Sequence, residues 1–335
     1  MQLTEYDRQF YAERIEPWLP PALWDCHVHL YKREFDHTPA EKKTDWMYRV
    51  ADEDTEEQLL DVYQSCFPSR EVKATVFGMP APDVDIPASN AYVAEVAARQ
   101  GWEKLALVHP DMDRAQLETA CAGFSGIKVY LSFARACIPR GEIRIYDFLT
   151  REMLEYCDEN ALVVMLHIPR SARLRDPVNL WQMLEIEQKY PRLKLIIAHV
   201  GRAYCAQDVG DAFDLLRDTR RMRFDISANT SEEAFSALLE AIPPQRVLFG
   251  TDLPILAMRA GRVTEDGVYY NIVPKGLYGD ITGLPNMREC PAHEPKTLLM
   301  YEGMAAFLKV CRQKNLPQSD IDAVFYGNAA ALWGE

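Results

Sequence analysis

The stretch LWDCHVHLYKRE, residues 23–34, begins as the apolar run of a buried strand and passes through two histidines into a polar segment without glycine. Side chains alternate along a strand, so Asp25, His27 and His29 share one face. Two imidazoles two residues apart can chelate one metal ion from the same side. A doubly wound α/β sheet normally carries a glycine-rich phosphate turn after its first strand, and this stretch has none.

Seven further short apolar runs follow, and segments of helical periodicity separate most of them. The expected strands are 23–30, 72–79, 104–109, 125–131, 162–167, 193–199, 222–227 and 246–252. The expected helices are 54–66, 89–100, 146–159, 177–190, 206–220 and 231–241, with two more at 296–314 and 328–333. Eight βα units predict an α/β protein with a (β/α)8 TIM barrel, and a doubly wound sheet is the alternative.

The length fits one domain. Barrels routinely exceed about 250 residues as a single domain, so we expect residues 1–335 to form one TIM-barrel domain. Residues 254–295 are rich in glycine and proline and predict a long rim loop above the C-terminal ends of the strands. This loop either covers the substrate or forms a surface excursion or a contact between subunits.

Charge and cysteine content limit the partners and the compartment. The chain has 50 acidic and 37 basic side chains, a formal net charge of −13, which argues against nucleic acid or an anionic membrane as a partner. It has no uninterrupted run of about 18 apolar residues and no secretory signal. Its eight cysteines form no CxxC pair, which predicts reduced thiols in a cytoplasmic protein. We expect a small-molecule substrate and leave a homo-oligomer open.

Five of the seven histidines lie at or near the C-terminal end of an expected strand, the end at which barrel active sites are built. They are His27, His29, His109, His167 and His199, and Asp252 ends the eighth expected strand in the same way. One histidine at a strand end is commonly just hydrogen-bonded. The combination of an HxH pair with two more histidines and an aspartate predicts a divalent metal site in an enzyme. A barrel that binds metal or a ligand without catalysis is the alternative, but it would not need His199 and Asp252 as well.

Four motifs and the C-terminal stretch carry a family resemblance. DCHVHL at 25–30, LHIPR at 166–170, AHVGR at 198–202, LFGTDLP at 248–254 and VFYGNAAALWG at 324–334 resemble the amidohydrolase superfamily. The similarity is to its amidohydrolase-related branch of metal-dependent hydrolases and aminocarboxymuconate-semialdehyde-type decarboxylases, and it covers nearly the whole chain. Many relatives wrap a β-sandwich around the barrel, but only 26 residues precede His27, so we expect the barrel to stand alone.

The resemblance implies that His27, His29 and His167 bind the metal. It makes Asp252 a ligand, the proton-handling residue, or both. In mononuclear members the histidine that His199 resembles contacts metal-bound water or substrate, whereas in binuclear members it binds a second ion.

Lys128 in GIKVYL, residues 126–131, bears on the number of ions. Binuclear members often bridge two metals with a carboxylated lysine on the fourth strand. However, Lys128 lies three residues before the expected strand end at Leu131, deeper than a bridging ligand should lie. We therefore expect one ion, zinc first and manganese second, with Lys128 as a paired charge or a substrate contact. A binuclear site is the alternative.

Arginines near the expected rim indicate the substrate. Arg170 and Arg202 lie three residues beyond His167 and His199, where a guanidinium can bind a carboxylate with two hydrogen bonds. Further arginines in HIPRSARLR, residues 167–175, make this loop locally basic and favour an anionic substrate. A surface ion pair is the alternative for each arginine. His109 either lines the pocket or makes a structural hydrogen bond, and we expect Asp25 to support the histidines rather than to bind metal.

The leading expectation is a metal-dependent hydrolase. Metal-activated water would attack a carbonyl, such as a lactone, ester or amide, of a small carboxylated molecule. Asp252 would move the proton, and His199 would orient or polarise the substrate. The alternative is a non-oxidative decarboxylase or a hydratase, a lyase, on the same scaffold. The residues at the strand ends do not separate these reactions.

Overall fold

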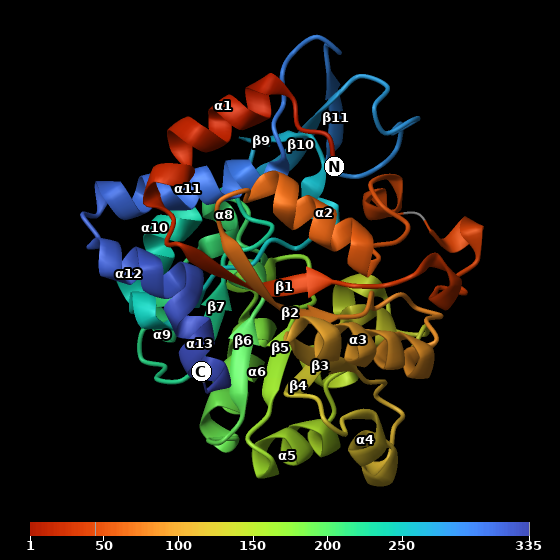
Figure 1. The fold of residues 1–335 in the computed structure, drawn as a ribbon. Coiled ribbons are helices and arrows are strands. Elements are labelled where there is room, and N and C mark those ends of the chain that lie inside the picture. Colours follow the sequence, from red (N-terminus) through yellow and green to blue (C-terminus); the bar gives the residue numbers. More distant parts are fainter. Residues whose placement is uncertain (44, 335) are drawn as a thin grey trace.

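Eight parallel strands, ordered β1 to β8 around the molecule, form a nearly closed barrel in the computed structural model, which describes residues 1–43 and 45–334. Each strand pairs with the next one in the sequence (Figure 1). The strands are β1 (Ala22–His29), β2 (Glu71–Phe77), β3 (Glu103–Leu107), β4 (Gly126–Val129), β5 (Val163–Leu166), β6 (Lys194–Ile197), β7 (Arg223–Asp225) and β8 (Val247–Leu248). The expected (β/α)8 barrel is confirmed.

The seam where the last strand meets the first is closed mainly by hydrogen bonds from the residues that follow β8. The expected strand 246–252 shortens to two residues, and the chain then continues beside β1 without forming a regular ladder. The amide of Cys26 donates to the carbonyl of Phe249 at 3.0 Å, and that of His29 donates to Leu253 at 2.8 Å. In return the amide of Asp252 donates to the carbonyl of His27 at 2.8 Å. The seam therefore holds the HxH pair directly beside Asp252.

Helices follow most of the strands and cover the outside of the barrel (Figure 1). Several begin at a side chain that accepts a hydrogen bond from the first turn, as Thr55, Asp113 and Asp176 do. The helices are α1 (Glu5–Arg14), α2 (Glu56–Cys66), α3 (Ile86–Gln100), α4 (Arg114–Ala120), α5 (Arg151–Glu159), α6 (Pro177–Lys189), α7 (His199–Arg202), α8 (Ala206–Val209), α9 (Ala212–Leu216), α10 (Glu232–Ala241), α11 (Leu299–Gln313), α12 (Gln318–Asp322) and α13 (Asn328–Trp333).

Several helices differ from the expectation. The single helix expected over 206–220 is divided into α8 and α9 because Gly210 adopts φ +52°, a left-handed conformation that ends α8. A side chain at this position would also collide with the neighbouring loop, since an added Cβ would lie 2.9 Å from Cβ of Arg175. The sequence pattern also did not predict four helices, namely α1, the short α4 between β3 and β4, the single turn α7 and the short α12.

Residues 254–295 contain a small sheet, which corrects the expectation of a long irregular loop. Its strands β9 (Gly261–Glu265), β10 (Val268–Pro274) and β11 (Met287–Cys290) lie in the order β11-β10-β9, with β10 in the centre. β9 runs antiparallel to β10, and β11 runs parallel to it. The sheet lies beside the barrel on the same side of the molecule as α1 (Figure 1). We call β9, β10 and β11 the rim sheet.

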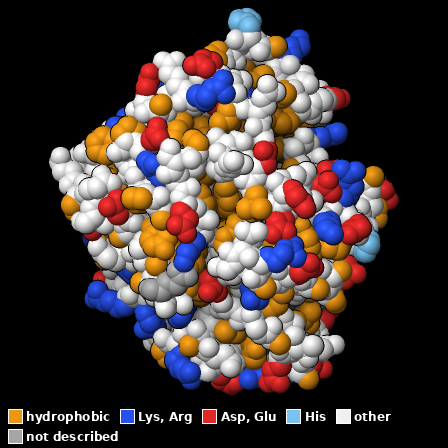
Figure 2. Space-filling view, in the orientation of Figure 1, with side chains coloured by type: hydrophobic (Ala, Val, Ile, Leu, Met, Phe, Trp, Pro, Cys, Tyr) orange, Lys and Arg blue, Asp and Glu red, His pale blue; other side chains and the backbone are white. Residues whose placement is uncertain are grey.

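The surface is mixed in charge although the net charge is −13. Acidic and basic side chains are interspersed over the face seen in Figure 2. All eight cysteines are free thiols, and only Cys137 is exposed. Within residues 1–43 and 45–334, we find no helix that combines the length and the apolar character needed to cross a membrane.

Candidate active site

The C-terminal ends of the strands open into a cavity of about 420 Å³. It collects side chains from seven of the βα units, all but that of β3, and from the rim sheet. Most of the site residues expected from the sequence line it, namely His27, His29, Lys128, His167, His199, Arg202 and Asp252. Arg170 and His109 do not.

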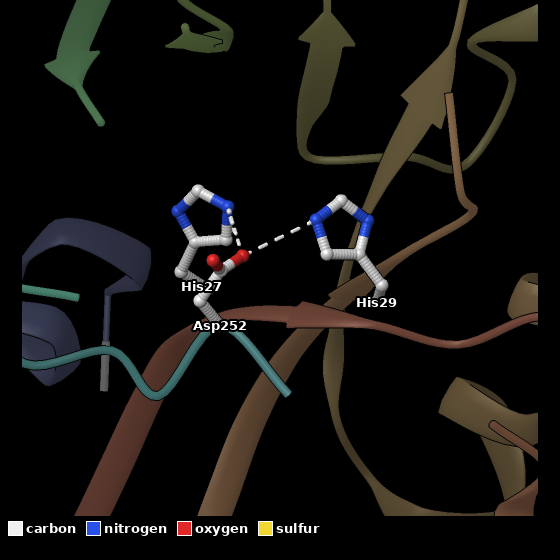
Figure 3. Close-up of side chains that lie close together, drawn as sticks. All are labelled: His27, His29 and Asp252. Carbon is white, nitrogen blue, oxygen red and sulfur yellow. Dashed lines mark ion pairs between the residues drawn. The ribbon is translucent and has the colours of Figure 1, made fainter. Parts of the chain in front are cut away.

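His27, His29 and Asp252 form a compact group in this cavity. Asp252 Oδ1 lies 3.5 Å from His27 Nε2 and 3.4 Å from His29 Nε2. Figure 3 shows both imidazoles turned toward this one carboxylate. The two histidines lie on β1, on one side of the seam, and Asp252 lies in the segment after β8, on the other side. One ligand atom from each residue lies within 4.8 Å of the others, a spacing at which the three can share one metal ion.

The far nitrogens of the two imidazoles fix their orientation. His29 Nδ1 lies 3.2 Å from the carbonyl oxygen of Gly78, and His27 Nδ1 lies 2.9 Å from Asp225 Oδ2. Both partners only accept, so each Nδ1 carries the proton and each Nε2 keeps its lone pair. Two lone pairs and one carboxylate thus converge on the same point, the donor set that a divalent metal ion requires.

Asp225 is a site residue that the sequence analysis did not single out. It ends β7, is fully buried, and supports two histidines, since it also accepts from the backbone amide of His199 at 3.0 Å. The signal was present in the sequence. The expected strand 222–227 has a carboxylate near its end, just as other strands end in a histidine.

Asp25 supports β1 from behind, as expected. Its carboxylate accepts from the amide of His27 at 3.2 Å, from Tyr63 Oη at 2.8 Å, and from the amide and hydroxyl of Thr251 at 2.9 and 2.5 Å. Burial raises the pKa of Asp25 to about 6. The residue ties β1 to the segment after β8, next to the metal-binding candidates but outside their group.

His199 begins α7, a turn with left-handed backbone angles. The φ values of His199, Val200 and Arg202 are +58°, +51° and +59°, which is unfavourable for any residue with a side chain and most of all for β-branched Val200. The hydroxyl of Ser227 donates to Asp225 Oδ1 at 2.5 Å, so its oxygen accepts from His199 Nδ1 at 2.9 Å. His199 Nε2 therefore keeps its lone pair, and the imidazole ring lies 4.6 Å from that of His27.

His167 follows β5 and stands beside the compact group rather than within it. Its ring centroid is 5.3 Å from that of His199 and 4.4 Å from that of Tyr130. Its Nδ1 is buried and has no hydrogen-bond partner among the described residues. A buried polar atom without a hydrogen-bond partner costs free energy. A bound ion or ligand that contacts Nδ1 would account for this atom. The ligand role expected for His167 stays a prediction.

Lys128 lies nearer the strand end than expected. β4 ends at Val129, so Lys128 lies one residue before the strand end rather than three, and the argument that it lies too deep does not hold. Lys128 lines the cavity, where the charges of Asp225 and Asp252 act on it, and its expected role as a paired charge or a substrate contact stays a prediction. Its Nζ lies 3.1 Å from His27 Nε2, and burial lowers its pKa to about 8.

The protonation states suit cation binding. Burial is the first cause that lowers the pKa of His27, His167 and His199, so these imidazoles are neutral at pH 7. Burial alone would raise the pKa of Asp252, but the proximity of His199, His29 and His27 outweighs burial and lowers this pKa to about 2. The cavity floor thus presents neutral imidazole nitrogens around one carboxylate.

The two expected substrate arginines have different places. Arg202 lines the cavity, and its Nη1 donates to the carbonyl of Ile168 at 3.2 Å, which holds the loop after β5. Arg170 lies outside the cavity, where its Nε pairs with Asp176 Oδ1 at 2.9 Å. This placement gives its expected substrate role no support. His109 also lies outside and accepts from the amide of Asp111 at 3.3 Å, which matches the structural alternative.

The walls of the cavity are basic, although the protein as a whole is acidic. The cations that line it are Lys42, Lys128, Arg135, Arg140, Arg202 and Arg262, against two carboxylates, Asp45 and Asp252. The rim sheet supplies Arg262 and Tyr269 to this wall. Both lie in residues 254–295, for which the sequence left a substrate-covering role open, and both line the cavity.

Comparison with known proteins agrees with this architecture. A family model described as Amidohydrolase matches residues 24–334. No curated protein matches the sequence.

Solved structures give similar folds at low identity. A probable 2-pyrone-4,6-dicarboxylic acid hydrolase from Acinetobacter baumannii, with citric acid bound, is 14% identical with a TM-score of 0.58, covering 93% of this chain and 99% of that chain. An amidohydrolase from Burkholderia multivorans with bound zinc is 13% identical with a TM-score of 0.60, at 93% and 99% coverage. A 2,6-dihydroxybenzoate decarboxylase complexed with 2,6-dihydroxybenzoate is 12% identical with a TM-score of 0.55, at 94% and 100% coverage. At these identities the likeness shows the fold.

Proposed function

The chain belongs to the amidohydrolase family, and from this membership we propose that it is a metal-dependent hydrolase acting on a carbonyl of a small carboxylated molecule. The bond cleaved would belong to a lactone, an ester or an amide. One observation carries the proposal: Nε2 of His27 and Nε2 of His29 converge on one carboxylate oxygen of Asp252 at the floor of a basic cavity.

The proposed metal site consists of His27, His29, His167 and Asp252. The orientation of the two β1 imidazoles and the unpartnered Nδ1 of buried His167 support this donor set. When bound, a divalent cation, zinc first and manganese second, supplies Lewis acidity that polarises a carbonyl and lowers the pKa of water to about 7. The zinc in the Burkholderia multivorans structure supports the choice of metal.

Asp252 is the proposed proton carrier. Its pKa of about 2 leaves it ionised at neutral pH, so it can accept the proton of an attacking water and later release it to the leaving group. His199 is the proposed orienting residue. With its Nδ1 proton directed to Ser227, its Nε2 can accept a hydrogen bond from the water or from a substrate hydroxyl.

The substrate is proposed to be an anion because six cations and two carboxylates line the cavity. Arg202 lines it between the loops that follow β5 and β6 and is a proposed carboxylate contact. Hydrogen bonds to backbone carbonyls hold the Arg202 side chain in place, so less side-chain conformational entropy is lost when a ligand binds.

The test is a turnover screen with zinc-loaded and metal-free protein. The panel pairs carboxylated lactones, esters and amides with uncharged counterparts, and acid release is measured at constant pH. We expect turnover of carboxylated compounds by the loaded protein, loss of it after chelation, and loss of it in Asp252→Asn. Turnover that survives metal removal would overturn the proposal.

A non-oxidative decarboxylase or hydratase is the second candidate, supported by the comparisons. The decarboxylase aligns with a TM-score of 0.55, close to the 0.58 of the pyrone hydrolase, and a 4-oxalomesaconate hydratase from Rhodopseudomonas palustris reaches 0.53. The same panel, extended with hydroxylated aromatic carboxylates, separates the candidates. Release of CO2 would favour the decarboxylase, addition of water without release of CO2 or acid would favour the hydratase, and acid release without CO2 would favour the hydrolase.

A further inference from the structure

Arg262 and two tyrosines form a cluster where the rim sheet meets the cavity. Arg262 lies on β9, Tyr269 on β10, and Tyr204 follows α7. The guanidinium carbon of Arg262 is 5.0 Å from the ring centroid of Tyr204 and 4.8 Å from that of Tyr269. The two rings are 4.9 Å apart, edge to face. Both aromatic faces therefore hold the cation by cation–π attraction and restrict its orientation.

The hydrogen bonds of Arg262 leave its charge unpaired. Its Nε donates to Asn271 Oδ1 at 2.9 Å and its Nη1 donates to the carbonyl of Ala228 at 2.6 Å, and both acceptors are neutral. Within residues 1–43 and 45–334, Arg262 forms no ion pair, and its Nη2 has no hydrogen-bond partner. Burial lowers the pKa of Arg262, as expected for a cation that lost water without gaining a counter-ion.

Arg173 provides an internal comparison. Its guanidinium lies against the same two rings, 5.2 Å from Tyr204 and 4.9 Å from Tyr269. Unlike Arg262, it has a carboxylate partner, Asp208 Oδ2, at 2.5 Å. Two cations share the aromatic pair, and the protein neutralises only one of them. The one left without an anion is the one that lines the cavity.

We infer that Arg262 binds a carboxylate of the substrate, with Tyr204 and Tyr269 as its positioning residues, so that the rim sheet selects substrates with a carboxylate remote from the reacting carbonyl. The inference rests on the proposed function for the reaction but adds a residue and a substrate class to it. An incoming carboxylate supplies the missing counter-ion, and Nη2 is free to donate to it. Affinity should then depend on the carboxylate charge and on the fork geometry of the arginine.

The test measures binding of isophthalate, a benzene ring with two carboxylates, and of its neutral counterpart isophthalamide. Isothermal titration calorimetry is run on the full chain, both metal-free and zinc-loaded. The variants are Arg262→Met, which removes the charge, and Arg262→Lys, which keeps it without the fork. Arg288→Met is the matched control, because Arg288 lies in the same sheet, stacks on Tyr270 and pairs with Glu265, away from the cavity. Thermal unfolding midpoints show that each variant is folded.

The expected result is that wild type and Arg288→Met bind isophthalate equally, in metal-free protein as well. Arg262→Met should bind it about tenfold or more weakly, in line with the loss of a charged hydrogen bond. Arg262→Lys should lie between them, and isophthalamide should bind weakly to all. Equal binding by wild type and Arg262→Met, or no binding of isophthalate by wild type, overturns the inference.

The two proposals fail in different ways. If Arg262 binds the carboxylate but no carbonyl substrate is hydrolysed, the calorimetric difference persists in metal-free protein while turnover is absent, and only the proposed hydrolase activity is lost. If hydrolysis occurs but Arg262→Met leaves KM for carboxylated substrates and isophthalate affinity unchanged, only the role of Arg262 is wrong. A purely structural role would lower the unfolding midpoint of Arg262→Met without this selective loss of affinity, and that result also overturns the inference.

Discussion

Asp225 is the residue on which the orientation of the site depends most. Its carboxylate accepts hydrogen bonds from Nδ1 of His27 and from the backbone amide of His199. It therefore sets which nitrogen of His27 faces the cavity. Carboxylates in this position raise the basicity of a ligating histidine and hold its tautomer. We expect Asp225→Asn to remain folded and to bind zinc about 10–100-fold more weakly. A competition titration against a chromophoric chelator measures this affinity.

Asp176→Asn is the control for this prediction. Asp176 is also buried, but it caps α6 and pairs with Arg170 outside the cavity. Its replacement should lower the unfolding midpoint without weakening zinc binding. If Asp225→Asn binds zinc as tightly as wild type, the assignment of His27 as a ligand through Nε2 is wrong.

Gly250 shows how little room the seam leaves beside the site. A Cβ built at this position would lie 2.8 Å from Cβ of His27 and 3.3 Å from Cβ of Ser227, and backbone-anchored atoms of this kind cannot move aside cheaply. We predict that Gly250→Ala destabilises the protein by about 1–3 kcal/mol and weakens zinc binding, since His27 must shift. Urea unfolding and the chelator titration measure the two effects.

Gly327→Ala serves as the matched control for Gly250→Ala. Gly327 has helical backbone angles, φ −60° and ψ −35°, and an added Cβ would meet nothing closer than Cβ of Ala323 at 3.9 Å. This change should leave stability equal or slightly higher, because alanine favours a helix more than glycine does. A loss of stability as large as that of Gly250→Ala would show that the effect is not steric.

At the scale of elements, α1 fixes the start of the rim segment. Asp7 on α1 is buried, and its carboxylate pairs with Arg259 Nη1 at 2.7 Å and accepts from Thr297 Oγ1 at 2.9 Å. Arg259 precedes the rim sheet in the sequence and Thr297 follows it, so Asp7 contacts both ends of the segment that contains the sheet. We expect Asp7→Asn to lower the unfolding free energy by about 2–3 kcal/mol, somewhat less than the roughly 3–5 kcal/mol of a fully buried pair because Arg259 is 20% exposed.

The pH dependence of that effect has a definite sign. Burial alone raises the pKa of Asp7, but the hydrogen bonds from Thr4, Arg259 and Thr297 outweigh it and lower the pKa overall. A carboxyl whose pKa is lowered by folding stabilises the protein above its unfolded pKa of about 4, and this contribution is lost as the pH falls through the folded value. The stability gap between wild type and Asp7→Asn should be full at pH 7 and shrink in acid. A gap that widens below pH 4 contradicts this account.

The elements that sequence predicts well are those with local signals. Short apolar runs located all eight strands, and polar residues at or near their C-terminal ends placed His27, His29, His167, His199 and Asp252 at one cavity. What sequence missed depends on contacts between distant segments. β8 ends at Leu248 because the next residues bond irregularly to β1. The helix expected over 206–220 is interrupted at Gly210, where Arg175 leaves no room for a side chain.

The rim sheet shows the same limit for the site. Glycines and prolines in 254–295 suggested a loop, and nothing local indicated that β9 would bring Arg262 against Tyr204, far away in sequence. For Arg170 the difference from its expected place has a local cause. It has the expected spacing from His167, but Asp176, six residues on, takes its guanidinium away from the cavity.

At the scale of the whole molecule, the proposed metal site lies on the joint at which the barrel closes, between the last strand and the first. β8 contributes only two residues, and the first strand is held to the last by hydrogen bonds around Phe249, Asp252 and Leu253. His27 and His29 come from one side of this joint and Asp252 from the other (Figure 3). An ion bound by all three would link the two ends of the sheet across the seam.

Zinc should therefore stabilise the entire fold and not only order the cavity. A ligand that binds the native state alone adds stability in proportion to the logarithm of its concentration, about 4 kcal/mol at 1,000 times the dissociation constant. We predict a rise in the unfolding midpoint of metal-free protein with added zinc, and slower hydrogen exchange of the seam amides of Cys26, His29 and Asp252. The double variant His27→Asn with His29→Asn should lose both effects, whereas Arg288→Met should keep them. An equal rise in the double variant would mean that zinc acts elsewhere on the chain, and that β1 and the segment after β8 close the barrel without it.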